Sequence, residues 1–154
     1  MEFEYLIIFL PLAGAIISGF FGKFLGSRNS EILTSLFVSI SSIFSFLIFY
    51  KVFNEGYINN LDIFTWINSG SFNVNWSIKI DALSSVMLVA VTLVSSIVHI
   101  YSIGYMSHDP HKQRFMSYLS LFTFSMLMLV TSDNFLQLFF GWEGVGLCLS
   151  LIHI

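Results

Sequence analysis

The chain has 154 residues, of which 56% are hydrophobic and only 10% are charged, and its mean hydropathy is +0.83. Soluble domains carry about 25% charged residues, so this composition excludes an ordinary soluble domain and indicates an integral membrane protein. A net charge of −3 without a basic stripe excludes a nucleic-acid-binding protein.

Five apolar runs are each long enough, at about 1.5 Å per residue, to cross a hydrocarbon layer about 30 Å thick. They are Tyr5–Phe21, Ile32–Phe53, Ala82–Tyr105, Phe115–Thr131 and Phe135–Ile154. No basic residue precedes the first run, so we expect a retained helix there and not a cleaved signal peptide. Short loops, 22–31 and 106–114, are expected after the first and third runs.

The segment between the second and third runs has the period-two pattern of a β-strand. Apolar residues alternate with polar ones from Phe72 to Ile80, and Leu61–Ile67 is rich in β-branched and aromatic residues. Between them, 68–71 reads Asn-Ser-Gly-Ser, which is turn chemistry. A β-hairpin on the membrane surface is therefore predicted.

The predicted fold is an all-α polytopic membrane protein of about five transmembrane helices, with this hairpin in the long external loop between helices 2 and 3. The expected organisation is two helices in 1–53, the hairpin loop in 54–80, and helices 3–5 in 81–154. The two short loops place four basic residues on one side of the membrane, and the opposite side has two. Because basic loops stay inside, we expect the N-terminus and the hairpin to face outside.

Glu143 lies about 12 Å into the fifth run, between Gly141 and Gly144. An ionised carboxylate near mid-membrane costs roughly 2.5–3.5 kcal/mol on insertion scales. A chain retains such a group when it has a partner, water or a proton to carry. The functional interpretation is a carboxylate that binds and releases a proton, and the alternative is a buried acid paired permanently with a lysine. Neighbouring glycines allow close helix contact, a loosened helix or a water pocket.

Other polar residues near the spans are assigned lesser roles. Asp133 and Asp81 are expected to cap helices, and Asp133 is also a candidate for proton uptake. His99 either bonds to a neighbouring helix or relays protons. Arg114 is expected to anchor the inner loop. His108 and His111 lack further ligands, and Cys148 is the single cysteine, so no metal site and no disulfide are predicted.

At the end of the chain, Asp133 to Cys148 includes the string Gly-Trp-Glu-Gly-Val-Gly. This stretch resembles the signature helix of the antiporter-like L subunit (chain 5) of respiratory complex I, NADH:quinone oxidoreductase. The segments Ile80–Ser84, Tyr101–Pro110 and Arg114–Phe115 resemble the same family in the same order. The resemblance covers residues 1–148 and is strongest from Ile80 onward.

The resemblance implies a membrane-arm subunit that moves protons, driven by electron transfer from NADH to quinone in other subunits. It implies that Glu143 is the proton-channel carboxylate. In the mechanism we expect, Asp133, His99 and Arg114 are candidate helpers. The lysine partner of this carboxylate lies on a later helix in the family. The chain would hold no cofactor, would contact other membrane-arm subunits and lipid, and would lie in a bacterial plasma membrane or mitochondrial inner membrane.

Three alternatives are weighed against this function. The large subunit of a multisubunit sodium/proton antiporter shares the helices and the glutamate but usually lacks the Gly-Val-Gly after it. Hydrogenase membrane subunits are related as well, and a structural scaffold would use Glu143 only as an ion-pair partner. Residues Leu149–Ile154 depart from the family pattern, so we expect a fragment with a non-native tail in which His153 has no function.

Overall fold

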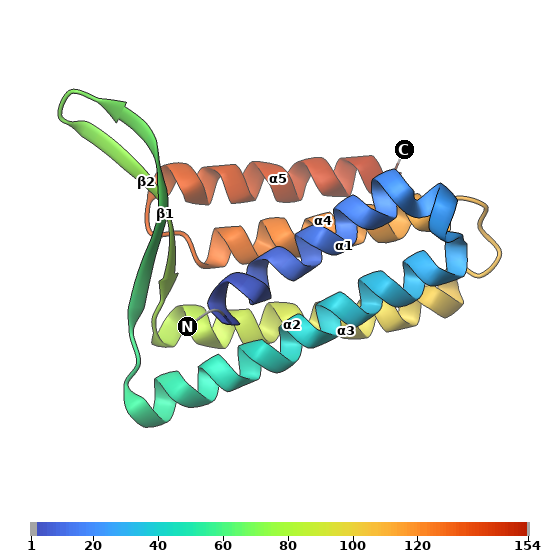
Figure 1. Cartoon of the computed structure of the whole chain (residues 1–154), viewed down its shortest axis with the longest axis horizontal. Coiled ribbons are helices and arrows are strands. Elements are labelled where there is room, and N and C mark those ends of the chain that lie inside the picture. Colours follow the sequence, from blue (N-terminus) through green and yellow to red (C-terminus); the bar gives the residue numbers. More distant parts are fainter. Residues whose placement is uncertain (1–2, 154) are drawn as a thin grey trace.

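The computed structural model describes residues 3–153 and consists of five long helices and one β-hairpin (Figure 1). The elements are α1 (Phe3–Leu25), α2 (Ser27–Glu55), β1 (Asn59–Ser69), β2 (Phe72–Ile80), α3 (Ala82–Tyr105), α4 (Lys112–Val130) and α5 (Phe135–His153). The helices lie side by side, and the hairpin crosses one end of the bundle. The five predicted helices and the hairpin between helices 2 and 3 are therefore confirmed.

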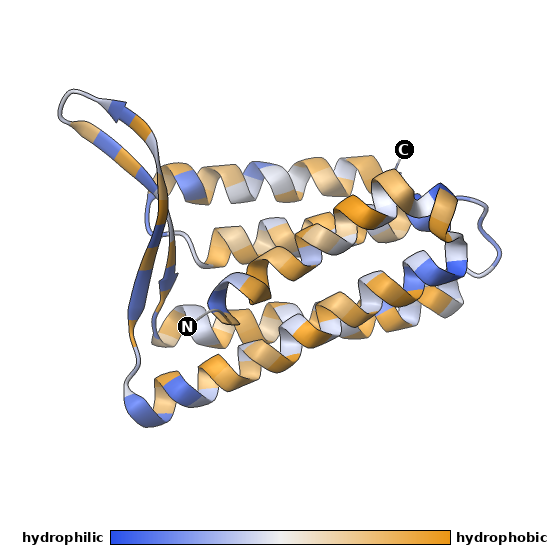
Figure 2. Cartoon of the chain, in the orientation of Figure 1, coloured by the Kyte–Doolittle hydropathy of each residue, from blue (hydrophilic) through white to orange (hydrophobic). Residues whose placement is uncertain are grey.

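Four helices, α1, α2, α3 and α5, are long and apolar enough to cross a membrane. The fifth, α4, is less apolar because it begins with Lys112-Gln113-Arg114 and buries several hydroxyl side chains. It packs against α1, α3 and α5, as a central helix does. Polar residues gather in the hairpin and at the opposite end of the bundle, with apolar helix surface between them (Figure 2).

The junction between α1 and α2 differs from the expected loop over 22–31. Only Gly26 interrupts the helices, with φ of +82°, a conformation that favours glycine. The polar residues that pointed to a loop, including Arg28 and Glu31, belong to the first turns of α2. Charged residues at a helix end reach the membrane surface without a loop, which is why polarity alone misplaced this boundary. Similarly, Lys112 and Arg114 belong to the first turn of α4 and not to the preceding loop.

The hairpin strands pair antiparallel from Asn59–Ile80 to Ser69–Phe72, with two register shifts in β1. The turn consists of Gly70 and Ser71 and is narrower than predicted. Gly70 has φ of +62°, as the first residue of a type II′ turn requires. Such a turn matches the twist of the strands and sets their register.

The main apolar core lies under the hairpin. Ile78 and Ile80 of β2 pack with residues from the adjacent ends of four helices; these include Ile8, Val52, Leu88 and Leu127. The hairpin therefore closes one end of the bundle and is not a free loop.

Hydroxyl side chains connect the helices within the apolar layer. The Ser41 hydroxyl donates to the Ile7 carbonyl at 2.6 Å, and the Ser117 hydroxyl donates to the Ala15 carbonyl at 2.7 Å. Ser45 and Thr92 share a hydrogen bond of 2.7 Å between α2 and α3. Small polar residues of this kind let membrane helices approach closely and bond to one another.

Candidate functional site

Helix α5 packs on α4 through a narrow face of small and polar residues. Gln137, Gly141 and Cys148 are its buried residues, and Gly144 lies on the same side. A Cβ at Gly141 would lie 2.8 Å from the Leu129 backbone, and one at Gly144 would lie 2.8 Å from the Ser125 hydroxyl. The sequence allowed three roles for these glycines: close helix contact, a loosened helix or a water pocket. Close helix contact is confirmed at Gly141 and Gly144.

Glu143 is presented on another side of the same helix. Residue 143 is two positions after Gly141, so its side chain is rotated by about 200° from the face that touches α4. The side chain is exposed on the bundle surface and lies nine residues into α5. The carboxylate therefore points to where no described helix covers it.

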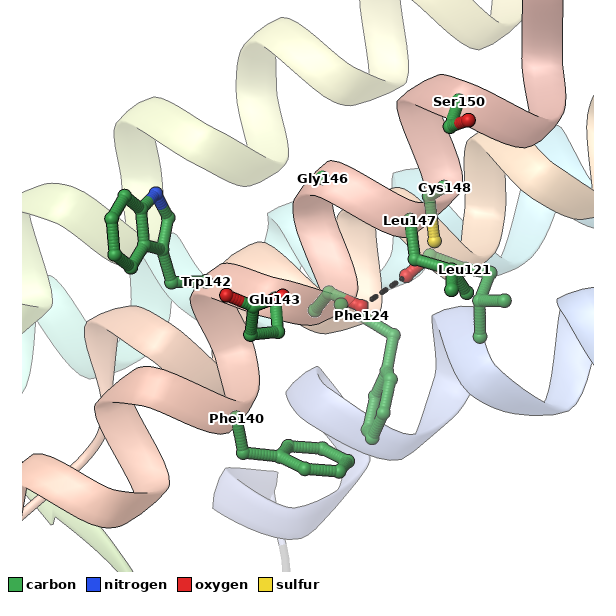
Figure 3. Close-up of a pocket in the computed structure, with 11 residues that line it drawn as sticks. Leu121, Phe124, Phe140, Trp142, Glu143, Gly146, Leu147, Cys148 and Ser150 are labelled. Carbon is green, nitrogen blue, oxygen red and sulfur yellow. Dashed lines mark hydrogen bonds between the residues drawn. The ribbon is translucent and has the colours of Figure 1, made fainter.

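Glu143 borders a groove of 780 Å³ that runs along α5 beside α4. The lining is mainly apolar and includes Leu121, Phe124, Phe140 and Leu147, with Ser125 and Ser150 as the other polar side chains. Figure 3 shows Glu143 on α5 between Trp142 and Phe140, and the rings of Phe124 and Phe140 extend in the same direction. Gly146 also lines the groove, and a Cβ there would meet nothing within 4 Å. This space is large enough for water or for side chains of another helix.

Neither of the two ion pairs within residues 3–153 includes Glu143. They join Lys79 to Asp133 at 3.1 Å and Lys112 to Glu31 at 3.9 Å. The groove lining contains no lysine, arginine or histidine. It likewise contains none of the three candidate helpers, so the structure does not bring Asp133, His99 or Arg114 to the carboxylate.

Asp133 does not cap α5, contrary to the prediction. The Gln137 backbone N–H donates to the Asn134 side-chain oxygen at 2.9 Å, so Asn134 is the capping residue. Asp133 instead pairs with Lys79 and accepts from the Asn60 amide at 3.1 Å. Both residues are good N-caps, and the helix begins at Phe135 as predicted, which places Asn134 and not Asp133 directly before it.

Asp81 caps α3 as predicted. Its carboxylate accepts from the Ser84 backbone N–H at 2.7 Å, and the Ser84 hydroxyl accepts from the Asp81 N–H at 2.8 Å, which completes a capping box. The hydrogen bond from the Ser84 backbone lowers the pKa of Asp81 below its ordinary value.

His99 is fully buried in α3 and bonds to the neighbouring helix α4. Its Nδ1 lies 2.8 Å from the Ser95 carbonyl, and its Nε2 lies 3.0 Å from the Ser120 hydroxyl. A carbonyl only accepts, so Nδ1 carries the proton and Nε2 accepts from Ser120. The predicted bond to a neighbouring helix is confirmed, and the relay role stays a prediction.

Arg114 lies at the start of α4, where its Nε donates to the Tyr118 hydroxyl at 3.2 Å on the exposed surface. His108 and His111 belong to the segment between α3 and α4. Within residues 3–153, no group of three or more His, Cys, Asp or Glu side chains is placed to hold a metal ion.

Two further carboxylates, Glu4 and Glu31, are buried, and the sequence predicted no site for either. Glu4, 4% exposed, accepts from the Tyr57 hydroxyl at 2.7 Å and from the Asn59 amide. Burial and the bond to Glu4 raise the pKa of Tyr57 above its ordinary value. Glu31 pairs with Lys112. An acid at the end of an apolar run is a normal surface residue, so no sequence pattern predicted either contact.

A bundle of apolar helices, closed at one end by a hairpin and exposing a carboxylate on one helix, defines a polytopic membrane protein whose acid lies within a span. A family profile described as NADH-Ubiquinone oxidoreductase (complex I), chain 5 N-terminus, matches residues 66–116. The chain is 57% identical over 147 residues to NADH-ubiquinone oxidoreductase chain 5 of Arabidopsis thaliana. It is 54% identical over 147 residues to NADH-quinone oxidoreductase subunit L of Rickettsia conorii.

Each of these two matches covers 96% of this chain and 22% of the relative. The chain belongs to the chain 5 (subunit L) family of complex I and spans about a fifth of the length of these relatives. The resemblance seen in the sequence is thereby confirmed.

Proposed function

We propose that the chain is part of a proton-translocating membrane-arm subunit of NADH:quinone oxidoreductase and that Glu143 carries the proton. The observation that supports this most directly is the exposure of Glu143 on α5, beside a 780 Å³ groove within an apolar helix bundle. The names of the relatives, which are NADH oxidoreductase chains, support the reaction to which transport is coupled.

The carboxylate acts by alternating between two environments. In one environment the side chain holds a proton. In the other it is ionised and paired with a cation on a later helix. The lysine expected on that helix would pair with Glu143, and each change in pairing moves a proton onward. Transport against the membrane potential requires about 2.3 kcal/mol per charge per 100 mV.

The surroundings of the chain follow from this function. Other membrane-arm subunits and lipid are its partners, while NADH and quinone react elsewhere in the complex. We propose that the chain itself holds no redox cofactor, and that residues 81–154 begin the channel domain. Asp133, His99 and Arg114 remain candidate helpers, placed away from the groove.

The orientation is proposed from charge. The C-terminal end of α1 and the N-terminal ends of α2 and α4 lie opposite the hairpin (Figure 1). These helix ends carry Lys23, Arg28, Lys112 and Arg114. Basic residues favour the inner side, so the hairpin faces outside, in the periplasm or intermembrane space. A cysteine introduced at Ser69 should react with an impermeant thiol reagent from outside; reaction only from the inner side would reverse this topology.

The test of function is Glu143→Gln in the full-length subunit, assembled in the complex. Glutamine keeps the size of the side chain and removes its proton exchange, so proton pumping coupled to NADH oxidation should be lost or greatly reduced. Glu55→Gln is the matched control, because Glu55 is an exposed acid at the end of α2. Unchanged pumping in Glu143→Gln, with normal assembly, would instead support a structural scaffold.

A further inference from the structure

The outer edge of β2 is paired with side chains and backbone of the α4–α5 junction. Along one edge of a strand, every second residue presents its N–H and C=O groups. The Asn75 carbonyl accepts from the Asn134 amide at 2.7 Å, and the Lys79 N–H donates to the Thr131 carbonyl at 2.9 Å. Between these two contacts, Ser77 uses both of its backbone groups on Gln137.

Gln137 replaces the neighbouring strand that Ser77 lacks on this side. Its Nε2 donates to the Ser77 carbonyl at 2.7 Å, and its Oε1 accepts from the Ser77 N–H at 3.1 Å. The Gln137 side chain is 0% exposed, and the amide satisfies two backbone groups that would be costly to bury unbonded. Because both hydrogen bonds go to Ser77, they fix the orientation of the Gln137 amide and its distance from β2.

Close contact between α5 and α4 is made at Gly141, Gly144 and Cys148, whose side chains are small or absent. Gln137 lies on the same face of α5, and both polar atoms of its amide are bonded to β2. A bond between a rigid strand and Gln137 therefore sets how α5 is turned about its axis. Glu143 lies six residues further along the same helix, about 9 Å away, and turns with it.

We propose that Gln137 is a positioning residue for Glu143: its amide fixes the rotation of α5 to the β2 edge and so determines which side of the bundle receives the carboxylate. The inference rests on the proposed function of Glu143 only for its effect on transport. The effect on helix rotation can be measured separately.

Cys148 offers a measure of rotation that does not depend on transport. It is 1% exposed on the α4-facing side of α5, beside Ser125. Ser125→Cys in the full-length subunit should therefore form an oxidative cross-link to Cys148, which mass spectrometry assigns. Gln137→Met in this background keeps the side-chain length and removes both hydrogen bonds. Ser77→Ala is the matched control, because Gln137 contacts only the backbone of Ser77.

With Gln137→Met, the cross-linking yield should fall at least about fivefold, the factor that each of the two lost hydrogen bonds represents. Protons pumped per NADH by the assembled complex, measured without the cross-linking cysteine, should fall too. Ser77→Ala should change neither. Cross-linking can be scored in membranes, so a variant that assembles poorly still gives an answer.

Unchanged cross-linking in Gln137→Met would overturn the inference, whatever happens to pumping. Reduced cross-linking with unchanged pumping would uphold the role of Gln137 in helix rotation and count against the proposed role of Glu143. Together with the Glu143→Gln result, these outcomes separate a wrong position from a wrong function.

Discussion

Gly141 of α5 and Leu129 of α4 are in direct backbone contact. A Cβ at residue 141 would lie 2.8 Å from the N, Cα and Cβ atoms of Leu129. Backbone atoms cannot turn away as a flexible side chain does, so the helices would have to separate. This contact sets the spacing between α4 and α5, and with it the groove that Glu143 borders.

Gly141→Ala should therefore destabilise the packing of α5 by about 1–3 kcal/mol, the range for overfilled cores. The measurement is the midpoint of thermal unfolding of the detergent-solubilised full-length protein. Gly146→Ala is the control on the same helix, since a Cβ there meets nothing within 4 Å. It should be neutral or stabilising by about 0.5–1 kcal/mol, because alanine favours helix over glycine. Equal effects of the two changes would contradict the assigned contact.

Asn134→Ala should be more damaging than Asp133→Ala, the reverse of what the sequence predicted. Loss of the cap on α5 costs about 1 kcal/mol, and loss of the bond to the Asn75 carbonyl costs about 1 kcal/mol more. Asp133→Ala removes a partly exposed ion pair with Lys79, which is worth less than about 1 kcal/mol, and an exposed hydrogen bond from Asn60. Urea or thermal unfolding of both variants provides the comparison, and a larger loss in Asp133→Ala would restore Asp133 as the cap.

The arrangement of elements was largely predictable because two strong signals determine it. Hydropathy located the helices, and α3 has the predicted bounds Ala82–Tyr105. The period-two pattern located β2, although β1 extends beyond Leu61–Ile67 at both ends. The errors lie at helix ends, where polar residues are compatible with a loop or with a helix that reaches the membrane surface. The composition predicted a loop over 22–31, whereas the junction between α1 and α2 consists of Gly26 alone.

For the candidate site, the sequence predicted Glu143 because a charge within an apolar run has few explanations. It did not identify Gln137, whose amide looks like an ordinary polar residue near a helix start. The role of Gln137 depends on Ser77, which is 60 residues away in the chain. No local pattern reports such a pairing, so only the folded arrangement reveals it. The expected lysine partner of Glu143 stays a prediction.

The stability conferred by Asp81 should depend on pH. The Ser84 N–H lowers the pKa of the folded carboxyl below its ordinary value of 3.8. Folding therefore favours the ionised form: the contribution is fully present above pH 3.8 and is lost as the pH falls from there through the folded-state pKa. Asp81→Asn keeps a capping oxygen without the charge, so its deficit relative to the unchanged protein should shrink on acidification. A deficit that stays constant from neutral pH to below 3.8 would contradict this sign.

His99 should be found with its proton on Nδ1. The Ser95 carbonyl at 2.8 Å requires a donor there, and the Ser120 hydroxyl at 3.0 Å then donates to Nε2. Nitrogen-15 NMR of labelled histidine in the full-length protein distinguishes the two ring nitrogens. Ser120→Ala should change the Nε2 signal more than the Nδ1 signal and destabilise the protein by about 0.6–1.7 kcal/mol, the range for hydrogen bonds between membrane helices. Ser102→Ala is the control, because that hydroxyl donates to the Val98 carbonyl on its own helix. A proton on Nε2 would contradict the hydrogen bond from Ser120 and, with it, the direction of any relay through His99.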